Sequence, residues 1–332
     1  MITLALLVQA TTVPARQRLF SRAVAVAATA LFAIPLRAQD TANRHLIQVT
    51  SSIDRTTQPS YLFLPPNPIT SVKPPLVVLM HSWSYGMEQR HVDLEADAAR
   101  RGWILLEPNF RGRNDHPDAC GSKLAQQDVL DAVAWVRAQY QVDSTRIYVT
   151  GNSGGGYMTM LMVEAAPTLW AAASAWVGIS DLMPWYEYHA TDHYGEMTRQ
   201  CLGGPPSAGG AIANEYRARS PLARLTSVAA VPIDLAAGRH DTTVPISHTL
   251  LAFNMLARAN RSTRISESEM AELTGPDAML RRPGVADTAT DPAFGRAVFL
   301  RRYTGRSRIT IFEGGHEWLP ATALTWLALH HK

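Results

Sequence analysis

The sequence lacks several features that mark common classes of binding protein. It has no Lys/Arg cluster interleaved with aromatic residues, which argues against nucleic acid as a partner. It also has no dinucleotide fingerprint and no phosphate-cradling loop, so we expect no nucleotide and no other cofactor. Charged residues make up only 18% of the 332 residues and hydrophobic residues 46%, a balance that excludes a largely disordered chain.

The sequence also lacks an apolar run long enough to cross a membrane. Its run from Ala23 to Pro35 has 13 residues, whereas a spanning helix needs ~20. Arginines precede this run and a small-residue segment ending at Ala38 follows it, which is the order of a secretory signal peptide. We therefore expect residues 1–38 to be a signal peptide and residues 39–332 to be exported, to the periplasm or the extracellular space. The alternative is an uncleaved membrane anchor.

Basic charge and cysteine are both scarce once this segment is set aside. The segment holds four arginines and no acidic residue, so its removal leaves 27 basic against 28 acidic residues and a formal net charge of −1 instead of +3. An anionic membrane surface is therefore not expected as a partner. Cys120 and Cys201 are the only cysteines. An even pair in an exported protein predicts a disulfide, with two buried free thiols as the alternative.

Apolar segments of strand length alternate with segments of helical spacing along the chain. This alternation predicts an α/β fold: a mostly parallel, twisted sheet of about eight strands with helices on both faces. An antiparallel hairpin between about residues 46 and 64 is expected at one edge. The predicted strands are 61–64, 76–80, 103–107, 146–150, 171–178, 232–237 and 308–312, and the predicted helices are 88–101, 123–140, 157–166, 246–259 and 321–330.

Two long segments interrupt this alternation, at about residues 181–220 and 261–306. The first is rich in aromatic residues, Gly and Pro, and the second is polar with three Pro-containing turns. Long insertions in compact domains are often binding elements. We expect one catalytic domain that carries both insertions, with no second core.

The segment Gly151-Asn152-Ser153-Gly154-Gly155 follows a predicted strand and opens a predicted helix. A serine at the apex of so sharp a turn is exposed to a substrate, and glycines two residues on either side remove side chains that would collide with neighbouring elements. Ser153 is therefore the candidate nucleophile. The pattern alone is weak, since chance supplies it in roughly one such chain in ten.

A serine nucleophile needs a base, and the base needs an orienting carboxylate. Asp241 and His316 each follow a predicted strand, so all three residues are expected at the carboxyl edge of the sheet, in the order Ser, Asp, His typical of this kind of elbow. The alternatives are that Asp241 only caps the next helix, that His316 is an ordinary loop residue, and that Asp181 is the acid.

An acyl-transfer site also needs donors for the developing oxyanion. We expect the backbone amides of Gly154, at the helix N-terminus, and of Trp83, in the loop after strand 76–80. The Trp83 ring could also line the pocket. Trp185, Tyr186 and Tyr188 are expected either to wall a substrate pocket or to pack the first insertion onto the domain. The cluster around His189 has some metal-ligand character but no supporting context, so we expect no metal.

From about Leu76 to its C-terminus the chain resembles the α/β-hydrolase superfamily, and within it the catalytic domain of the prolyl-oligopeptidase-like family. The resemblance implies that Ser153, Asp241 and His316 are nucleophile, acid and base. Gly154 departs from the family's usual aromatic residue, and His81-Ser82 departs from its usual His-Gly. The segments that carry the resemblance are 109–112, 142–147, 151–158, 216–222 and 241–245.

Peptidases of this family carry a β-propeller ahead of the hydrolase domain, whereas here fewer than 40 residues separate the predicted signal from the first strands. We therefore expect a serine hydrolase that favours small carboxylic esters over short peptides. The alternatives are a peptidase acting on small peptides and, more remotely, a non-catalytic binding protein on the same fold.

Overall fold

The computed structural model describes residues 43–66, 72–288, 290–292 and 294–332. The predicted signal peptide lies outside these residues. The described chain forms a nine-stranded sheet in the order β1-β2-β4-β3-β5-β6-β7-β9-β8. The strands are β1 (Arg44–Thr50), β2 (Thr57–Phe63), β3 (Leu76–Met80), β4 (Ile104–Pro108), β5 (Ile147–Asn152), β6 (Ala172–Trp176), β7 (Ile233–Gly238), β8 (Val298–Thr304) and β9 (Ser307–Phe312).

The six strands at the centre of the sheet run parallel, and antiparallel strands flank them on both sides. β1 and β2 form the expected hairpin at one edge, and β8 pairs antiparallel with β9 at the other. The strands β3, β4 and β6 are fully buried and mostly apolar, as expected when helices cover both faces of a sheet. The predicted α/β class is confirmed.

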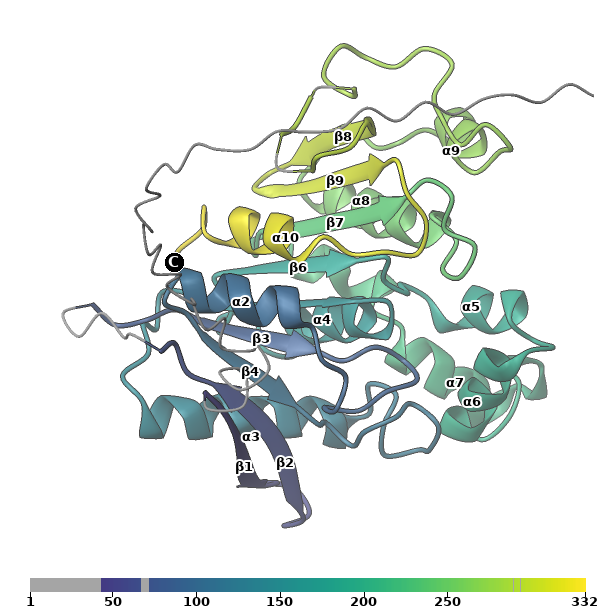
Figure 1. The fold of residues 1–332 in the computed structure, drawn as a ribbon. Coiled ribbons are helices and arrows are strands. Elements are labelled where there is room, and N and C mark those ends of the chain that lie inside the picture. Colours follow the sequence, from purple (N-terminus) through teal and green to yellow (C-terminus); the bar gives the residue numbers. More distant parts are fainter. Residues whose placement is uncertain (1–42, 67–71, 289, 293) are drawn as a thin grey trace, which may run out of the picture.

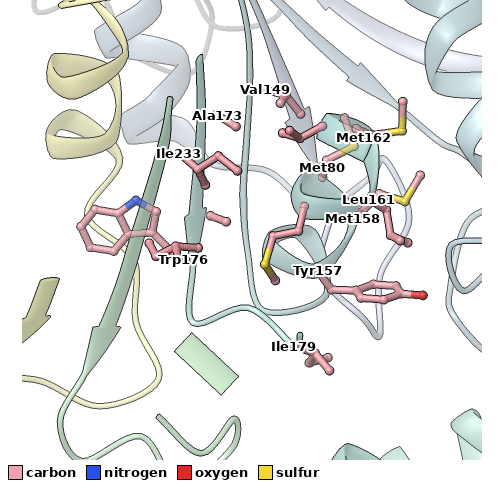
Figure 2. Close-up of a cluster of buried hydrophobic side chains, with 14 of the residues drawn as sticks. Met80, Val149, Tyr157, Met158, Leu161, Met162, Ala173, Trp176, Ile179 and Ile233 are labelled. Atoms are coloured by element: carbon pink, nitrogen blue, oxygen red, sulfur yellow. The ribbon is translucent and has the colours of Figure 1, made fainter. Parts of the chain in front are cut away.

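Helices cover the two faces of the sheet unequally (Figure 1). α2 (Val92–Arg100) and α10 (Pro320–Leu327) share one face and pack against the smaller of two apolar clusters. The larger cluster contains the buried apolar side chains of the helices on the other face, and Figure 2 shows the part of it where α4 meets the strands. The helices on that side are α3 (Lys123–Gln139), α4 (Gly154–Ala165) and α8 (Ser247–Ala259).

The first predicted insertion folds into a small helical unit at one end of the sheet. It contains α5 (Leu182–Tyr188), α6 (His193–Leu202) and α7 (Gly210–Arg219). In Figure 1 these helices lie beyond the arrowheads of β3, β6 and β7, so they stand at the carboxyl ends of the parallel strands. This is the edge at which open α/β sheets carry their sites.

The second predicted insertion contains an element that the sequence analysis did not anticipate. Besides α9 (Glu267–Leu273), it contributes β8. β8 carries Arg301 and Arg302 in mid-strand, so its sequence does not read as an apolar strand. Both charges are paired in the structure, Arg301 with Asp291 and Arg302 with Asp287, and these pairs let a charged strand close the edge of the sheet.

Candidate active site

Ser153 occupies the turn between β5 and α4 in a conformation that non-glycine residues rarely adopt. Its backbone angles are φ 57° and ψ −122°, and only 5% of the surface of Ser153 is exposed. Strained backbone of this kind costs about 1–3 kcal/mol and clusters at functional sites. The strand, the turn and the helix that the sequence predicts around Ser153 are all present.

The two glycines flanking the turn are required by close approach of backbone, as the motif predicts. A Cβ built on Gly151 would lie 2.7 Å from the carbonyl carbon of Gly155. A Cβ built on Gly155 would lie 2.2 Å from the carbonyl oxygen of Met80, at the end of β3. Both distances are shorter than any real Cβ contact, so the elbow can form only with glycine at these positions.

Asp241 and His316 meet at the carboxyl edge of the sheet. His316 Nδ1 lies 3.0 Å from Asp241 Oδ1 and 2.8 Å from Oδ2, and the carboxylate is fully buried while the imidazole side chain is 24% exposed. The backbone amides of Thr243 and Val244 also donate to Asp241 Oδ1, at 2.9 Å each. Asp241 therefore stabilises the turn before α8 and contacts His316 at the same time.

Asp181, the alternative acid, has a different set of partners. It is the N-cap of α5, where its side chain accepts a hydrogen bond from the Met183 amide. The Ser220 hydroxyl donates to the same oxygen at 3.2 Å. These contacts assign Asp181 to holding the first insertion together.

No hydrogen bond joins Ser153 to His316 among the described residues, although both follow parallel strands of one sheet. Nucleophile–base contacts are often long in free enzymes and shorten when substrate binds. The triad as a working unit therefore stays a prediction.

Gly154 and Trp83 approach each other closely. A Cβ built on Gly154 would lie 2.4 Å from the Trp83 backbone nitrogen and 2.6 Å from its Cα. Within the described chain, neither amide donates a hydrogen bond to a protein group. Two free, adjacent amides, one of them at a helix N-terminus, form an arrangement able to bind an oxyanion.

The Trp83 ring is buried rather than exposed to a pocket. It is 1% exposed and lies against Tyr157 and Trp185, with ring centroids 5.7 Å and 5.9 Å apart. Trp185 is itself fully buried. Trp185 thus packs the insertion onto the domain, and its pocket role stays a prediction.

Tyr186 and Tyr188 lie on the same helix, α5, in less buried positions. Tyr186 is partly buried and its ring packs edge-on against Tyr216. Tyr188 is 54% exposed, and its hydroxyl donates to the Thr242 carbonyl beside Asp241. A pocket role for these two tyrosines stays a prediction.

A cavity of about 630 Å³ beside α9 has none of the predicted site residues in its wall.

Both ring nitrogens of His189 contact protein groups. Nδ1 lies 2.6 Å from an Asp192 oxygen and Nε2 lies 2.8 Å from the Thr243 carbonyl. His189 therefore joins the insertion to the loop that carries Asp241.

Among the residues that the structure describes, no group of three or more His, Cys, Asp or Glu side chains could hold a metal, and no helix has the length and apolar character to cross a membrane.

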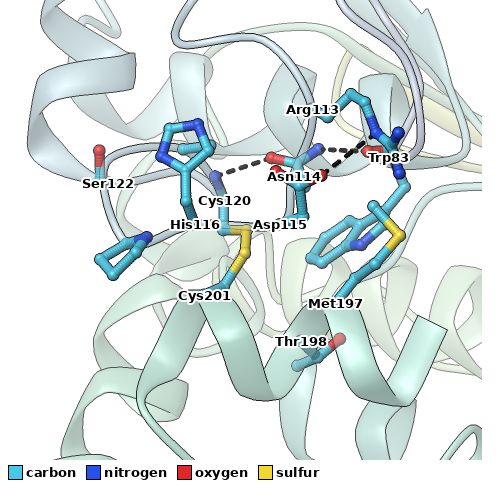
Figure 3. Close-up of a disulfide and its surroundings, with 12 residues drawn as sticks. Trp83, Arg113, Asn114, Asp115, His116, Cys120, Ser122, Met197, Thr198 and Cys201 are labelled. Carbon is cyan, nitrogen blue, oxygen red and sulfur yellow. Dashed lines mark hydrogen bonds and ion pairs between the residues drawn. A yellow bond between two sulfur atoms is a disulfide. The ribbon is translucent and has the colours of Figure 1, made fainter. Parts of the chain in front are cut away.

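Cys120 and Cys201 form a disulfide, as the sequence predicts. It joins α6 to the loop between β4 and α3 (Figure 3). In the same loop the sequence analysis missed Asn114, whose side chain and backbone contact Trp83. The sequence carries no signal for this contact, because 31 residues separate the partners and no motif connects them.

The sequence profile of the prolyl oligopeptidase family matches residues 90–270, more than half of the chain. The chain belongs to the prolyl oligopeptidase family. It is therefore a serine hydrolase of the α/β-hydrolase fold, as the resemblance in its motifs predicts.

Relatives with assigned names include both peptidases and esterases. The chain is 26% identical over 166 residues to the uncharacterized peptidase YtmA of Bacillus subtilis, covering 49% of this chain and 62% of YtmA. It is 30% identical over 132 residues to feruloyl esterase B of Talaromyces funiculosus, covering 36% of each protein. The chain thus spans less than two thirds of these relatives.

Solved structures support the fold. A puromycin-hydrolyzing peptidase of Mycobacterium tuberculosis matches with a TM-score of 0.58 and 20% identity, over 86% of this chain and 38% of that one. At this identity the likeness concerns the fold alone.

Proposed function

We propose that the protein is an exported serine hydrolase that cleaves small carboxylic esters through Ser153, His316 and Asp241. The contact between His316 Nδ1 and the buried Asp241 carboxylate carries this proposal, because it leaves Nε2 as the nitrogen that can take a proton. The exposed part of the imidazole gives substrate access to the pair.

The reaction follows the acyl-enzyme route. Ser153 Oγ attacks the carbonyl carbon while His316 Nε2 takes its proton, and the imidazolium that forms is stabilised by Asp241. Collapse of the tetrahedral intermediate expels the alcohol, which takes the proton from Nε2. Water, deprotonated by the same nitrogen, then attacks the acyl-serine and releases the acid. The amides of Gly154 and Trp83 would hold the oxyanion in both steps.

The likeness to feruloyl esterase B supports an ester substrate, and the likeness to YtmA supports the second candidate, a peptidase acting on short peptides. Both reactions use the same acyl-enzyme chemistry. Export is supported by the disulfide, because disulfides persist in oxidising compartments.

Labelling by a fluorophosphonate tests the nucleophile. The wild-type protein should become covalently labelled, with hydrolysis of short acyl esters lost in proportion, and Ser153→Ala should neither label nor turn over. A wild-type protein that resists labelling, or a labelled Ser153→Ala variant, would refute the proposal. Rates on an acyl-ester series beside aminoacyl arylamides then decide between ester and peptide.

Asparagine substitutions test the acid. Asp241→Asn should lower kcat by roughly 10⁴-fold, because it favours the wrong imidazole tautomer while preserving the shape of the site. Asp181→Asn, a matched change in the same sheet edge, should leave kcat within a few-fold of wild type because Asp181 caps α5. The reverse ranking would transfer the acid role to Asp181.

A further inference from the structure

Asn114 is buried beside the proposed oxyanion hole, and both the nitrogen and the oxygen of its side-chain amide are hydrogen-bonded. It is 2% exposed. Its backbone amide donates to the Trp83 carbonyl at 3.0 Å, and its side-chain Nδ2 donates to the same oxygen at 3.3 Å. Its Oδ1 accepts the Cys120 amide at 2.7 Å (Figure 3). One residue thus holds one carbonyl twice and is itself held from the other side.

The peptide group on the other side of Trp83 is also fixed. The Ser82 carbonyl, which shares a planar peptide with the Trp83 N–H, lies 3.1 Å from His81 Nδ1 and accepts the Tyr85 amide at 3.4 Å. With Asn114 holding the following peptide, both planes that meet at the Trp83 Cα are set. These contacts restrict the direction in which the Trp83 N–H can point.

The anchor behind Asn114 is covalent. Cys120 has a left-handed backbone conformation, φ 50°, and its sulfur is bonded to Cys201 of α6. Contacts therefore run from the helical insertion through the disulfide, the Cys120 amide and Asn114 to the Trp83 carbonyl.

We propose that Asn114 is a positioning residue that holds the Trp83 amide in line with the amide of Gly154 for the oxyanion. This inference rests on the proposed function. Asn114 touches no reacting atom; it acts through Trp83. A preorganised donor contributes most to the transition state, because it needs no reorganisation when charge develops.

Two substitutions remove the hydrogen bonds in different ways. Asn114→Ala deletes the side chain, whereas Asn114→Leu removes both side-chain hydrogen bonds at similar volume. In each variant the backbone amide of residue 114 can still donate to the Trp83 carbonyl. Each should lower kcat by about 10- to 100-fold, below the 10²–10³ that complete loss of an oxyanion donor costs, and leave KM within about threefold. The affinity for a trifluoromethyl ketone, which forms an oxyanion at the site, should fall by the same factor as kcat/KM.

Asn254 offers a matched control. Its amide pairs with loop backbone in the same manner, donating to the Ile265 carbonyl and accepting the Ile265 amide at 2.8 Å each, and it is partly buried in α8. Asn254→Ala and Asn254→Leu should lower the melting temperature while kcat and ketone affinity stay near wild type.

The outcomes separate this inference from the proposed function. If the wild type labels with fluorophosphonate and hydrolyses esters or peptides, but the Asn114 variants keep kcat within twofold or lose only stability as the Asn254 variants do, the positioning role is wrong and the proposed function stands. If one Asn114 variant does not fold, the other decides. A wild type that neither labels nor hydrolyses these substrates overturns both.

Discussion

Gly154 fixes how closely the two proposed oxyanion donors approach. Its Cα packs so tightly on the Trp83 backbone that no larger residue fits without moving the 82–83 peptide. The sequence analysis identified Gly154 as a departure from the family's aromatic residue. In the structure, the loop carrying Trp83 occupies the space where that side chain would begin.

Gly154→Ala should lower kcat by about 10²–10³-fold, because its Cβ displaces the Trp83 amide from the oxyanion. Gly275→Ala is the control: its Cβ would lie 3.1 Å from the Ala271 carbonyl oxygen, just beyond the end of α9 and away from Ser153 and Trp83. Steady-state kinetics and melting temperatures of both variants provide the test. An equal loss of kcat in the two, explained by equal loss of folded protein, would contradict this account.

Individual site residues were predictable to the extent that they belong to a local motif. Ser153 and its glycines share one turn, and Asp241 and His316 each follow a strand, so sequence position alone suggested their place. Burial of Trp185 and the contacts of Asn114 were not predictable, because both depend on which distant segments pack together. The sequence alone does not distinguish an aromatic residue that faces a ligand from one that packs in a core.

At the scale of elements, the insertion that contains α5, α6 and α7 is tied to the domain at several places, two of which adjoin the proposed site. The disulfide ties α6 to the loop after β4. Tyr188 and His189 tie the end of α5 to the carbonyls of Thr242 and Thr243, next to Asp241. The insertion thus contacts both the oxyanion side and the acid side of the proposed site.

Replacing both Cys120 and Cys201 by Ala should destabilise the protein by about 4 kcal/mol, since the disulfide closes an 81-residue span, and lower the melting temperature by roughly 10 °C. Thermal unfolding with and without reductant measures this. Reductant should leave the melting temperature of the double variant unchanged; a double variant that melts at the wild-type temperature would show that the bond contributes little.

Helices and strands were predictable where the spacing of their apolar residues matches the period of one type of secondary structure. The predicted strand at residues 76–80 is β3 itself, and most other boundaries lie within a few residues of those observed. β8 was missed because its arginines are neutralised only by acids such as Asp287 and Asp291, which the fold brings beside them. The sequence of an edge strand does not show which charges the folded chain will pair with it.

At the scale of the whole molecule, a buried carboxyl group couples stability to pH. Glu107 in β4 is 3% exposed, and burial raises its pKa to about 7. Arg44 lowers this pKa by its charge and its hydrogen bond, but burial has the larger effect. Because the folded pKa lies above that of an exposed glutamate, the folded state holds this proton more tightly than the unfolded chain does. The stabilising contribution is complete below about pH 4.5 and is lost as pH rises through about 7.

Glu107→Gln should remove this dependence. Between pH 5 and pH 8 the wild type should lose on the order of 2 kcal/mol of unfolding free energy relative to the variant. Urea unfolding of both proteins at the two pH values measures this difference in unfolding free energy. Burial also raises the pKa of Glu164 to about 7, but Glu164 is present in both proteins, so its contribution cancels. Parallel pH profiles would mean that Glu107 is ionised in the folded protein.

The bonds between the helical insertion and the domain bear on how new substrate preferences could arise in this fold. A segment attached only at its ends can be exchanged between relatives as a cassette. Here α6 is bonded to Cys120 and α5 rests on the backbone beside Asp241. A transplanted segment would have to bring compatible anchor points with it, so recombination that alters selectivity here would tend to alter turnover as well.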